Sequence, residues 1–206
     1  MEIKVCGLRE VSNITEVIKL LPDYLGFIFY PHSKRYVGNQ AVLANCLAAI
    51  SNVKKVGVFV NATEYDIHQA IETYHLDFAQ LHGMETPAFC NAIATIAPVT
   101  KAFHLHQAFD FSQIIDYENI CSNFLFDTAS PDYGGTGMTF DWTLLEQYTG
   151  STPFFLSGGI SIAHIERIKA FTHPMFKGID INSRFETAFG IKDIQLLKLL
   201  LHEIRH

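Results

Sequence analysis

The sequence lacks the features that would place it in a membrane, on a nucleic acid or in an oxidising compartment. No apolar run approaches the roughly 18 residues that a transmembrane helix needs, and the opening residues, MEIKVCGLRE, have no apolar core like that of a signal peptide. The net charge of −6 argues against a nucleic-acid partner, because phosphate backbones attract basic surfaces. We therefore expect a cytoplasmic protein that binds neither membranes nor nucleic acids.

The cysteines form no metal-binding or disulfide motif. Four of them are scattered along the chain, with no CxxC pair and no zinc-like spacing: Cys6, Cys46, Cys90 and Cys121. Scattered thiols fit a reducing cytosol better than a disulfide framework. Cys46 and Cys90 lie among apolar residues with helical spacing and are predicted to belong to the core. Cys6 follows a short strand-like run and precedes a glycine, so it is either a small buried hydrophobe or a thiol pointing into a site.

Eight short apolar runs recur along the chain with helical patterns between them. They cover residues 3–6, 25–29, 55–60, 77–81, 99–103, 124–127, 154–157 and 176–181. Helical spacing is clearest over 41–50, 162–171 and the leucine-rich 191–204. Alternating strands and helices require a parallel sheet, because each crossover needs about a dozen residues. We predict one α/β domain over 1–206, a closed (β/α)8 barrel, with an open doubly wound sheet as the alternative.

The sixth run ends in a carboxylate followed by a glycine-rich segment. Asp127 closes the run, and residues 128–137 contain one proline and three glycines, which predicts a mobile loop. Thr139 then has the character of a helix N-cap. A carboxylate between a buried strand and such a loop is typical of an α/β active site, although Asp127 in a purely structural role would only cap the strand.

The other predicted strand ends also carry polar groups, and in a barrel these ends meet on one face. Arg35 lies in the loop after the second run, and an arginine there is either a solvated charge or a ligand for a carboxylate. Ser157-Gly158-Gly159 and Asn182-Ser183 each precede a predicted helix start, where backbone N–H groups favour a phosphate. His104 and His106 are interpreted as polar pocket lining or part of a loop, and no His/Asp metal set is expected at the strand ends.

Several stretches together resemble phosphoribosylanthranilate isomerases. They are KVCGL at 4–8, GFIFYPHSKRYV at 26–37, VGVFVN at 56–61, LDFAQLHG at 76–83, FDTASPDYGGTGMTFDW at 126–142, LSGGI at 156–160, GIDINSRFE at 178–186 and GIKD at 190–193. They cover the chain from end to end in the family's order. One departure is Asn182-Ser183-Arg184, where family members usually carry Ser-Ser-Gly.

The resemblance implies an Amadori rearrangement that turns an aminoaldose phosphate into an aminodeoxyketose phosphate. Asp127 would be the general acid, and Cys6 the general base, with a thiolate favoured by a lowered pKa. Arg35 would hold the anthranilate carboxylate. The remaining substrate-binding residues would be His82, Gly135, Gly158, Gly159, Asp180, Asn182 and Ser183, with the 134–137 loop folding over the substrate.

The same resemblance also implies which cofactors and partners to expect. The reaction needs no redox step, so neither a cofactor nor a metal is expected. The partner is a small phosphorylated substrate, and the chain is expected to be a monomer or a homodimer. Two alternatives stay open: another phosphosugar isomerase, and a non-catalytic relative that binds a phosphorylated ligand on the same barrel.

Overall fold

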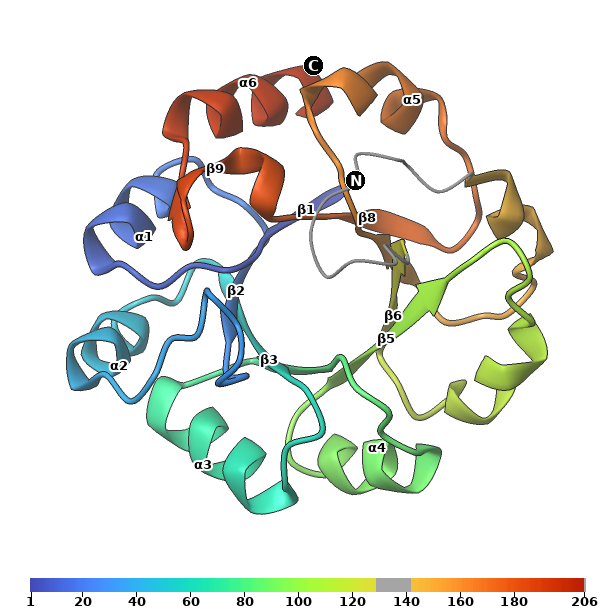
Figure 1. Ribbon diagram of the computed structural model, residues 1–206, viewed down its shortest axis with the longest axis horizontal. Coiled ribbons are helices and arrows are strands. Elements are labelled where there is room, and N and C mark those ends of the chain that lie inside the picture. The colour runs from blue at the N-terminus through green and yellow to red at the C-terminus, as the bar shows by residue number, and fades with distance from the viewer. Residues whose placement is uncertain (129–141, 206) are drawn as a thin grey trace.

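The protein forms a closed eight-stranded parallel barrel, seen end-on in Figure 1. The computed structural model describes residues 1–128 and 142–205. The strands are β1 (Glu2–Val5), β2 (Tyr24–Ile28), β3 (Lys54–Phe59), β4 (Phe78–Leu81), β5 (Val99–Leu105), β6 (Asn123–Thr128), β7 (Phe154–Leu156) and β8 (Phe176–Ile181). Each strand pairs with its sequence neighbour, and β8 pairs with β1 to close the ring. This closure confirms the predicted barrel and excludes the doubly wound sheet.

Helices surround the barrel as an outer ring (Figure 1). The α-helices are α1 (Val11–Ile18), α2 (Ala41–Ala48), α3 (Glu64–Tyr74), α4 (Pro87–Ala94), α5 (Ile165–Ala170) and α6 (Ile194–Arg205). Short 3₁₀ helices replace or precede α-helices in the later units: η1 (Phe111–Tyr117), η2 (Trp142–Gln147), η3 (Ile162–His164) and η4 (Ser183–Phe185). The predicted helix over 162–171 therefore starts as a 3₁₀ turn. Among the described residues, none of the helices is both long and apolar enough to cross a membrane.

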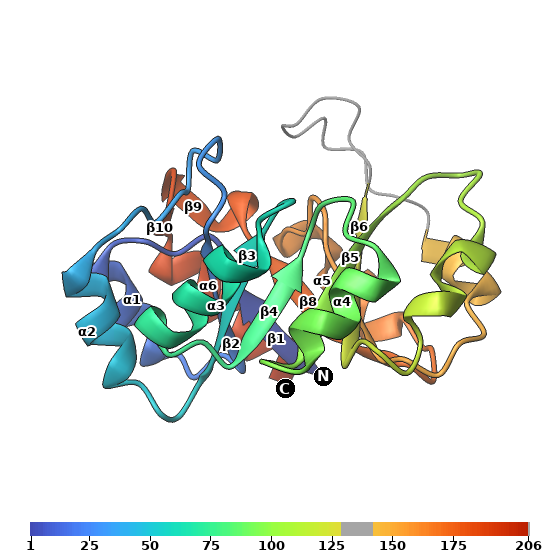
Figure 2. The same ribbon diagram turned by 90° about the horizontal axis from the view of Figure 1, so that it is seen from below.

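The closing helix starts later than its leucine pattern predicts. Ile191–Lys192 forms the short strand β10, which pairs antiparallel with β9 (Glu186–Ala188) beyond the end of β8. The Asp193 carboxylate accepts hydrogen bonds from the backbone N–H groups of Gln195 and Leu196, and so caps α6 at its true start. In Figure 2 this β9–β10 hairpin lies on the side of the barrel away from the two chain ends.

Apolar side chains fill the space between the strands and the helices, and a second, smaller cluster lies inside the barrel. The inner cluster consists of Tyr24, Val56, Ala102, Leu125 and Phe155, with Phe78 packed against it. Side chains alternate along a strand, so every second residue further along faces the same interior. On β4 this direction gives Phe78, then Gln80, then His82. The barrel interior thus changes from apolar to polar toward the carboxyl ends of the strands, where ligand chemistry sits in this fold.

The two cysteines predicted to belong to the core are packed as expected. Cys90 on α4 is fully buried, and Cys46 on α2 is half-buried against the core. The glycine-rich loop predicted over 128–137, including Gly135, and the N-cap at Thr139 lie outside the described residues, apart from Thr128 at the end of β6.

Candidate active site

Cys6 lies just after β1, at the carboxyl end of the barrel, and is 5% exposed. Its backbone N–H donates to the carbonyl oxygen of Ile181 at 2.9 Å, which ties it to the end of β8. Gly26 on β2 makes room for the thiol, because a Cβ at that position would lie 2.7 Å from the Cys6 Sγ. The structure therefore places Cys6 at the strand ends, as predicted, in a closely packed setting.

A buried ion pair lies one layer below the thiol. The Lys4 Nζ is 2.7 Å from the Asp180 Oδ2, in a register that sets the two residues side by side on β1 and β8. Burial opposes the charge on Lys4, but the Asp180 carboxylate and the nearby Cys6 hold the pKa of Lys4 above its ordinary value. The other Asp180 oxygen, Oδ1, is buried without a hydrogen-bond partner among the described residues. Such an acceptor is suited to a hydroxyl group of a ligand.

The pKa of Cys6 moves opposite to the expected direction. Burial raises it, and the Asp180 carboxylate adds to the rise, although the ammonium groups of Lys4 and Lys192 act to lower it. The predicted lowering of the Cys6 pKa was therefore wrong, because desolvation of the packed sulfur outweighs the two lysines.

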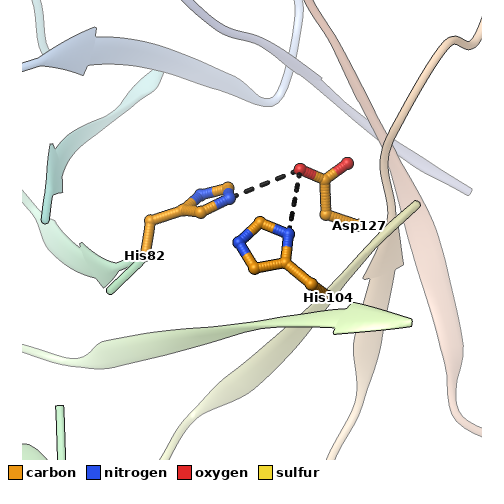
Figure 3. Close-up of side chains that lie close together, drawn as sticks. All are labelled: His82, His104 and Asp127. Carbon is orange, nitrogen blue, oxygen red and sulfur yellow. Dashed lines mark ion pairs between the residues drawn. The ribbon is translucent and has the colours of Figure 1, made fainter. Parts of the chain in front are cut away.

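Asp127 is the second-last residue of β6, and it lies beside His104 on β5 and His82, which directly follows β4 (Figure 3). The His82 Nε2 lies 3.4 Å from the Asp127 Oδ2, and the His104 Nδ1 lies 3.9 Å from the same oxygen. Burial lowers the pKa of His104, and the neighbouring His82 lowers it further. The β5–β6 register sets His104 directly opposite Asp127. These contacts bring together two strand-end residues that the sequence singled out, Asp127 and His82.

The same three side chains also have a spacing that the sequence did not single out. Ligand atoms of His82, His104 and Asp127 all lie within 4.8 Å of one another, a spacing that could hold a metal ion. A His/Asp set at the strand ends was not expected from the sequence, because the three residues come from different strands.

Arg35 is held by a carboxylate from the opposite end of the chain. Its Nε lies 2.8 Å from the Glu186 Oε1, and its Nη2 lies 2.6 Å from the Glu186 Oε2. The Lys192 Nζ reaches the same Glu186 at 2.9 Å and the Asn182 Oδ1 at 2.8 Å. Burial opposes ionisation of Glu186, yet Arg35 and Lys192 together hold its pKa below the usual value. Arg35 is therefore an ordered side chain rather than a solvated charge.

Glu186 and Lys192 were not among the predicted site residues. The only signal for them was their position inside two of the recognised stretches, at the end of GIDINSRFE and within GIKD. Gly7 explains how closely this group approaches β1. With φ at 78°, it leaves space that a Cβ would fill at 2.5 Å from the Asn182 Oδ1 and 2.7 Å from the Arg35 Cδ.

The two turns predicted to bind phosphate follow β7 and β8. Gly158 and Gly159 have φ values of 88° and 62°, a conformation that favours glycine, and a Cβ on Gly159 would meet nothing within 4 Å. This turn is thus open on one side. Ser183 and Arg184 are exposed on η4, and the Arg184 charge is close enough to His164 on η3 to contribute to lowering its pKa, after burial and Arg167. The helix starts predicted after both turns are short 3₁₀ helices.

The chain matches the model of one protein family and many proteins that carry the same name. Residues 3–203 match the family described as N-(5′-phosphoribosyl)anthranilate (PRA) isomerase. Proteins named N-(5′-phosphoribosyl)anthranilate isomerase from Parabacteroides distasonis and Phocaeicola vulgatus are 46% and 39% identical. Each alignment covers 100% of this chain, and it covers 94% and 98% of the relative respectively.

Several solved structures with this fold carry the same name. Phosphoribosylanthranilate isomerase from Thermotoga maritima superimposes with a TM-score of 0.87 at 28% identity, over 100% of this chain and 98% of the other. An isomerase in complex with reduced 1-(o-carboxyphenylamino)-1-deoxyribulose 5-phosphate superimposes with a TM-score of 0.85 at 26% identity and the same coverage. Monomeric forms generated from a dimeric Thermotoga maritima isomerase superimpose with a TM-score of 0.84, again at 26% identity and the same coverage.

Proposed function

This chain belongs to the N-(5′-phosphoribosyl)anthranilate isomerase family, and from that membership we propose the roles of its side chains in the reaction. The reaction is the Amadori rearrangement of N-(5′-phosphoribosyl)anthranilate to 1-(2-carboxyphenylamino)-1-deoxyribulose 5-phosphate in tryptophan biosynthesis. What carries the proposal is that one carboxyl group, on Asp127, and one thiol, on Cys6, stand at the carboxyl ends of different strands of one barrel.

Asp127 acts as the general acid and Cys6 as the general base. Protonation of the furanose oxygen by Asp127 breaks the ring C–O bond and leaves an open-chain iminium ion. The Cys6 thiolate then removes the proton on C2, and the resulting enol tautomerises to the ketone. The electrons stay within the substrate throughout, so these steps call for neither a cofactor nor a metal. The thiolate is the minor form of Cys6, and the ammonium groups of Lys4 and Lys192 stabilise its charge.

Arg35 binds the anthranilate carboxylate. Glu186 grips the guanidinium through Nε and Nη2, which fixes its plane before substrate arrives. The substrate carboxylate then approaches the Nη1 edge. Glu186 also balances the charges of Arg35 and Lys192, so the free site does not hold two uncompensated cations.

The remaining predicted residues hold the sugar phosphate. Gly158, Gly159, Asn182 and Ser183 bind the phosphate through the turns after β7 and β8, and the unpartnered Oδ1 of Asp180 accepts from a sugar hydroxyl. His82 supports the acid, and Gly135, which lies outside the described residues, keeps its predicted role in substrate binding. We place the whole chain in one domain, acting in the cytoplasm as a monomer or homodimer.

One assay tests the function directly. Phosphoribosylanthranilate is fluorescent, so purified protein should abolish its fluorescence in a time-dependent manner. Tight binding of a product analogue without turnover would instead indicate a non-catalytic relative. Turnover of another phosphosugar with none of this substrate would indicate a different isomerase.

A further inference from the structure

Gln80 connects the ion pair on one side of the barrel interior to the histidine on the other. It is 1% exposed on β4, and its Oε1 accepts a hydrogen bond from the Lys4 Nζ at 2.9 Å. Its Nε2 lies 3.0 Å from the His82 Nδ1. A continuous line of polar contacts thus runs from Asp180 through Lys4 and Gln80 to His82.

The direction of these hydrogen bonds is fixed by Lys4. An ammonium group has only donors, so the oxygen of the Gln80 amide must face Lys4, and the amide nitrogen must face the imidazole. An amide nitrogen is itself only a donor, so the His82 Nδ1 must be the acceptor. A neutral imidazole that accepts at Nδ1 carries its proton on Nε2.

We infer that Gln80, oriented by Lys4, is a positioning residue that fixes His82 in the tautomer whose Nε2–H points at Asp127. The His82 Nε2 atom lies 3.4 Å from the Asp127 Oδ2, the nearer atom of the acid (Figure 3). With Oδ2 occupied by this donor, Oδ1 is the oxygen that presents a proton to the substrate. The orientation of the proposed acid therefore depends on a lysine and an amide that do not touch it.

The same hydrogen bonds decide between two uses of the His82, His104 and Asp127 cluster. A metal ion between these residues needs a lone pair on the His82 Nε2. In the fixed tautomer this nitrogen carries a proton and has no lone pair to give. The cluster therefore places a protonated imidazole nitrogen beside the acid, although its spacing resembles that of a metal site.

The wild-type protein tests the tautomer without any substitution. Long-range ¹H–¹⁵N NMR distinguishes a protonated Nε2 from a protonated Nδ1 by the nitrogen shifts and couplings of each ring. We expect the neutral form of His82 to show a protonated Nε2 and a bare Nδ1. A neutral His82 protonated on Nδ1 overturns the inference, whatever the protein's activity.

Two substitutions of Gln80 then test whether this residue fixes the His82 tautomer. Gln80→Glu supplies a carboxylate that accepts from both Lys4 and His82, so the proton should move to Nδ1. Gln80→Met keeps a similar volume and removes the donor, so His82 should lose its single tautomer. The matched control is Asn123→Asp on β6, because Asn123 is also a 1% exposed amide that accepts a hydrogen bond from a lysine, Lys177, at 2.9 Å.

The expected kinetic effect falls on the chemical step and rests on the proposed function of Asp127. Both Gln80 variants should lower kcat by about 10- to 100-fold, the usual cost of a misplaced catalytic group, with KM changed by no more than about threefold. Asn123→Asp should keep the wild-type tautomer and kcat.

The combined NMR and kinetic results test the role of Gln80 separately from the proposed function. An unchanged His82 tautomer in both folded Gln80 variants overturns the inference. A shifted tautomer with normal kcat keeps the effect of Gln80 on His82 but shows that this tautomer does not position the acid, whose own role is tested by Asp127→Asn. If Gln80→Glu does not fold, Gln80→Met and the wild-type spectra still decide the question.

Discussion

The two sides of the barrel mouth surround their reactive groups with opposite kinds of neighbours. On the β1 and β8 side, the thiol of Cys6 is 5% exposed and lies among ammonium groups and carboxylates that pair with one another. On the β4 to β6 side, the Asp127 side chain is 21% exposed and lies beside two imidazoles. The side of the proposed base is closely packed and charged, whereas the side of the proposed acid is more exposed and carries two imidazoles.

This difference matches the two proton transfers. A thiol buried among ions reaches its thiolate only against desolvation, so its charge is governed by the protein around it. A carboxyl group at the rim meets solvent and can regain a proton between turnovers. The comparison indicates that burial controls the base, whereas hydrogen-bond direction controls the acid.

The largest effects are expected from removing the two reactive groups. Asp127→Asn and Cys6→Ala should each lower kcat by at least about 100-fold, the usual contribution of a general acid or base. Steady-state kinetics measures this, and circular dichroism checks the fold. Cys90→Ala is the matched control, because Cys90 is a buried thiol away from the strand ends and should keep its kcat. Near-normal kcat in either reactive-group variant would show that its assigned role is wrong.

The next effect concerns the carboxylate site beside the base. Arg35→Ala should weaken binding of a product analogue by about 1.5–3 kcal/mol, the value of a hydrogen bond to a charged group. Titration calorimetry measures the loss, and an analogue without the carboxylate should bind both proteins alike. Lys34→Ala is the neighbouring control, since both cations lie over the ring of Phe189. Equal losses for both analogues would mean that Arg35 acts through its pairing with Glu186.

A third prediction follows from the burial of Cys6. Because its folded-state pKa is raised, both states keep the proton below the ordinary thiol pKa, and stability is unaffected there. Above that pKa the unfolded chain ionises first, so the folded state loses stability as pH increases, by at most about 1.4 kcal/mol per pH unit.

Urea unfolding of wild type and Cys6→Ala from pH 7.5 to 10 isolates this contribution. The stability difference between the two proteins should shrink as pH rises. A difference that instead grows with pH would mean that the thiol is a stabilised thiolate, and the contrast between the two sides would then disappear.

The smallest effect is expected from Arg184, where the family usually has glycine. Its side chain is exposed on η4, so we expect it to be an auxiliary contact to phosphate, with most binding carried by the backbone around Gly159 and Ser183. Arg184→Gly should weaken phosphate binding by less than about 1 kcal/mol at low salt and flatten its salt dependence. Unchanged affinity at every salt concentration would make Arg184 a solvated charge, and a loss above about 3 kcal/mol would make it the principal ligand.

The barrel itself was predictable because strand burial leaves a strong local signal. Strands covered on both faces appear as continuous apolar runs, and eight of them separated by helical segments require a parallel sheet and favour a closed one. The errors in the predicted bounds lie at the ends of helices and strands, because one or two polar contacts determine where an element begins. Asp193, for example, caps α6 and leaves Ile191–Lys192 to pair as a strand, which a leucine count does not show.

The site was only partly predictable, because its pairings join distant residues. Arg35 and Glu186 are far apart along the chain yet form the closest contact at the carboxylate site, and Lys192 joins them only through the β9–β10 hairpin. Likewise, the approach of His82 and His104 to Asp127 depends on strand order and register.

The sequence by itself determined the strands, the helices and the residues standing at the strand ends, because these depend on neighbours within a few positions. Tertiary structure alone decided the charge of Cys6, the partner of Arg35 and the tautomer of His82. Burial and hydrogen-bond direction set these properties, and both come from side chains brought together only when the barrel closes.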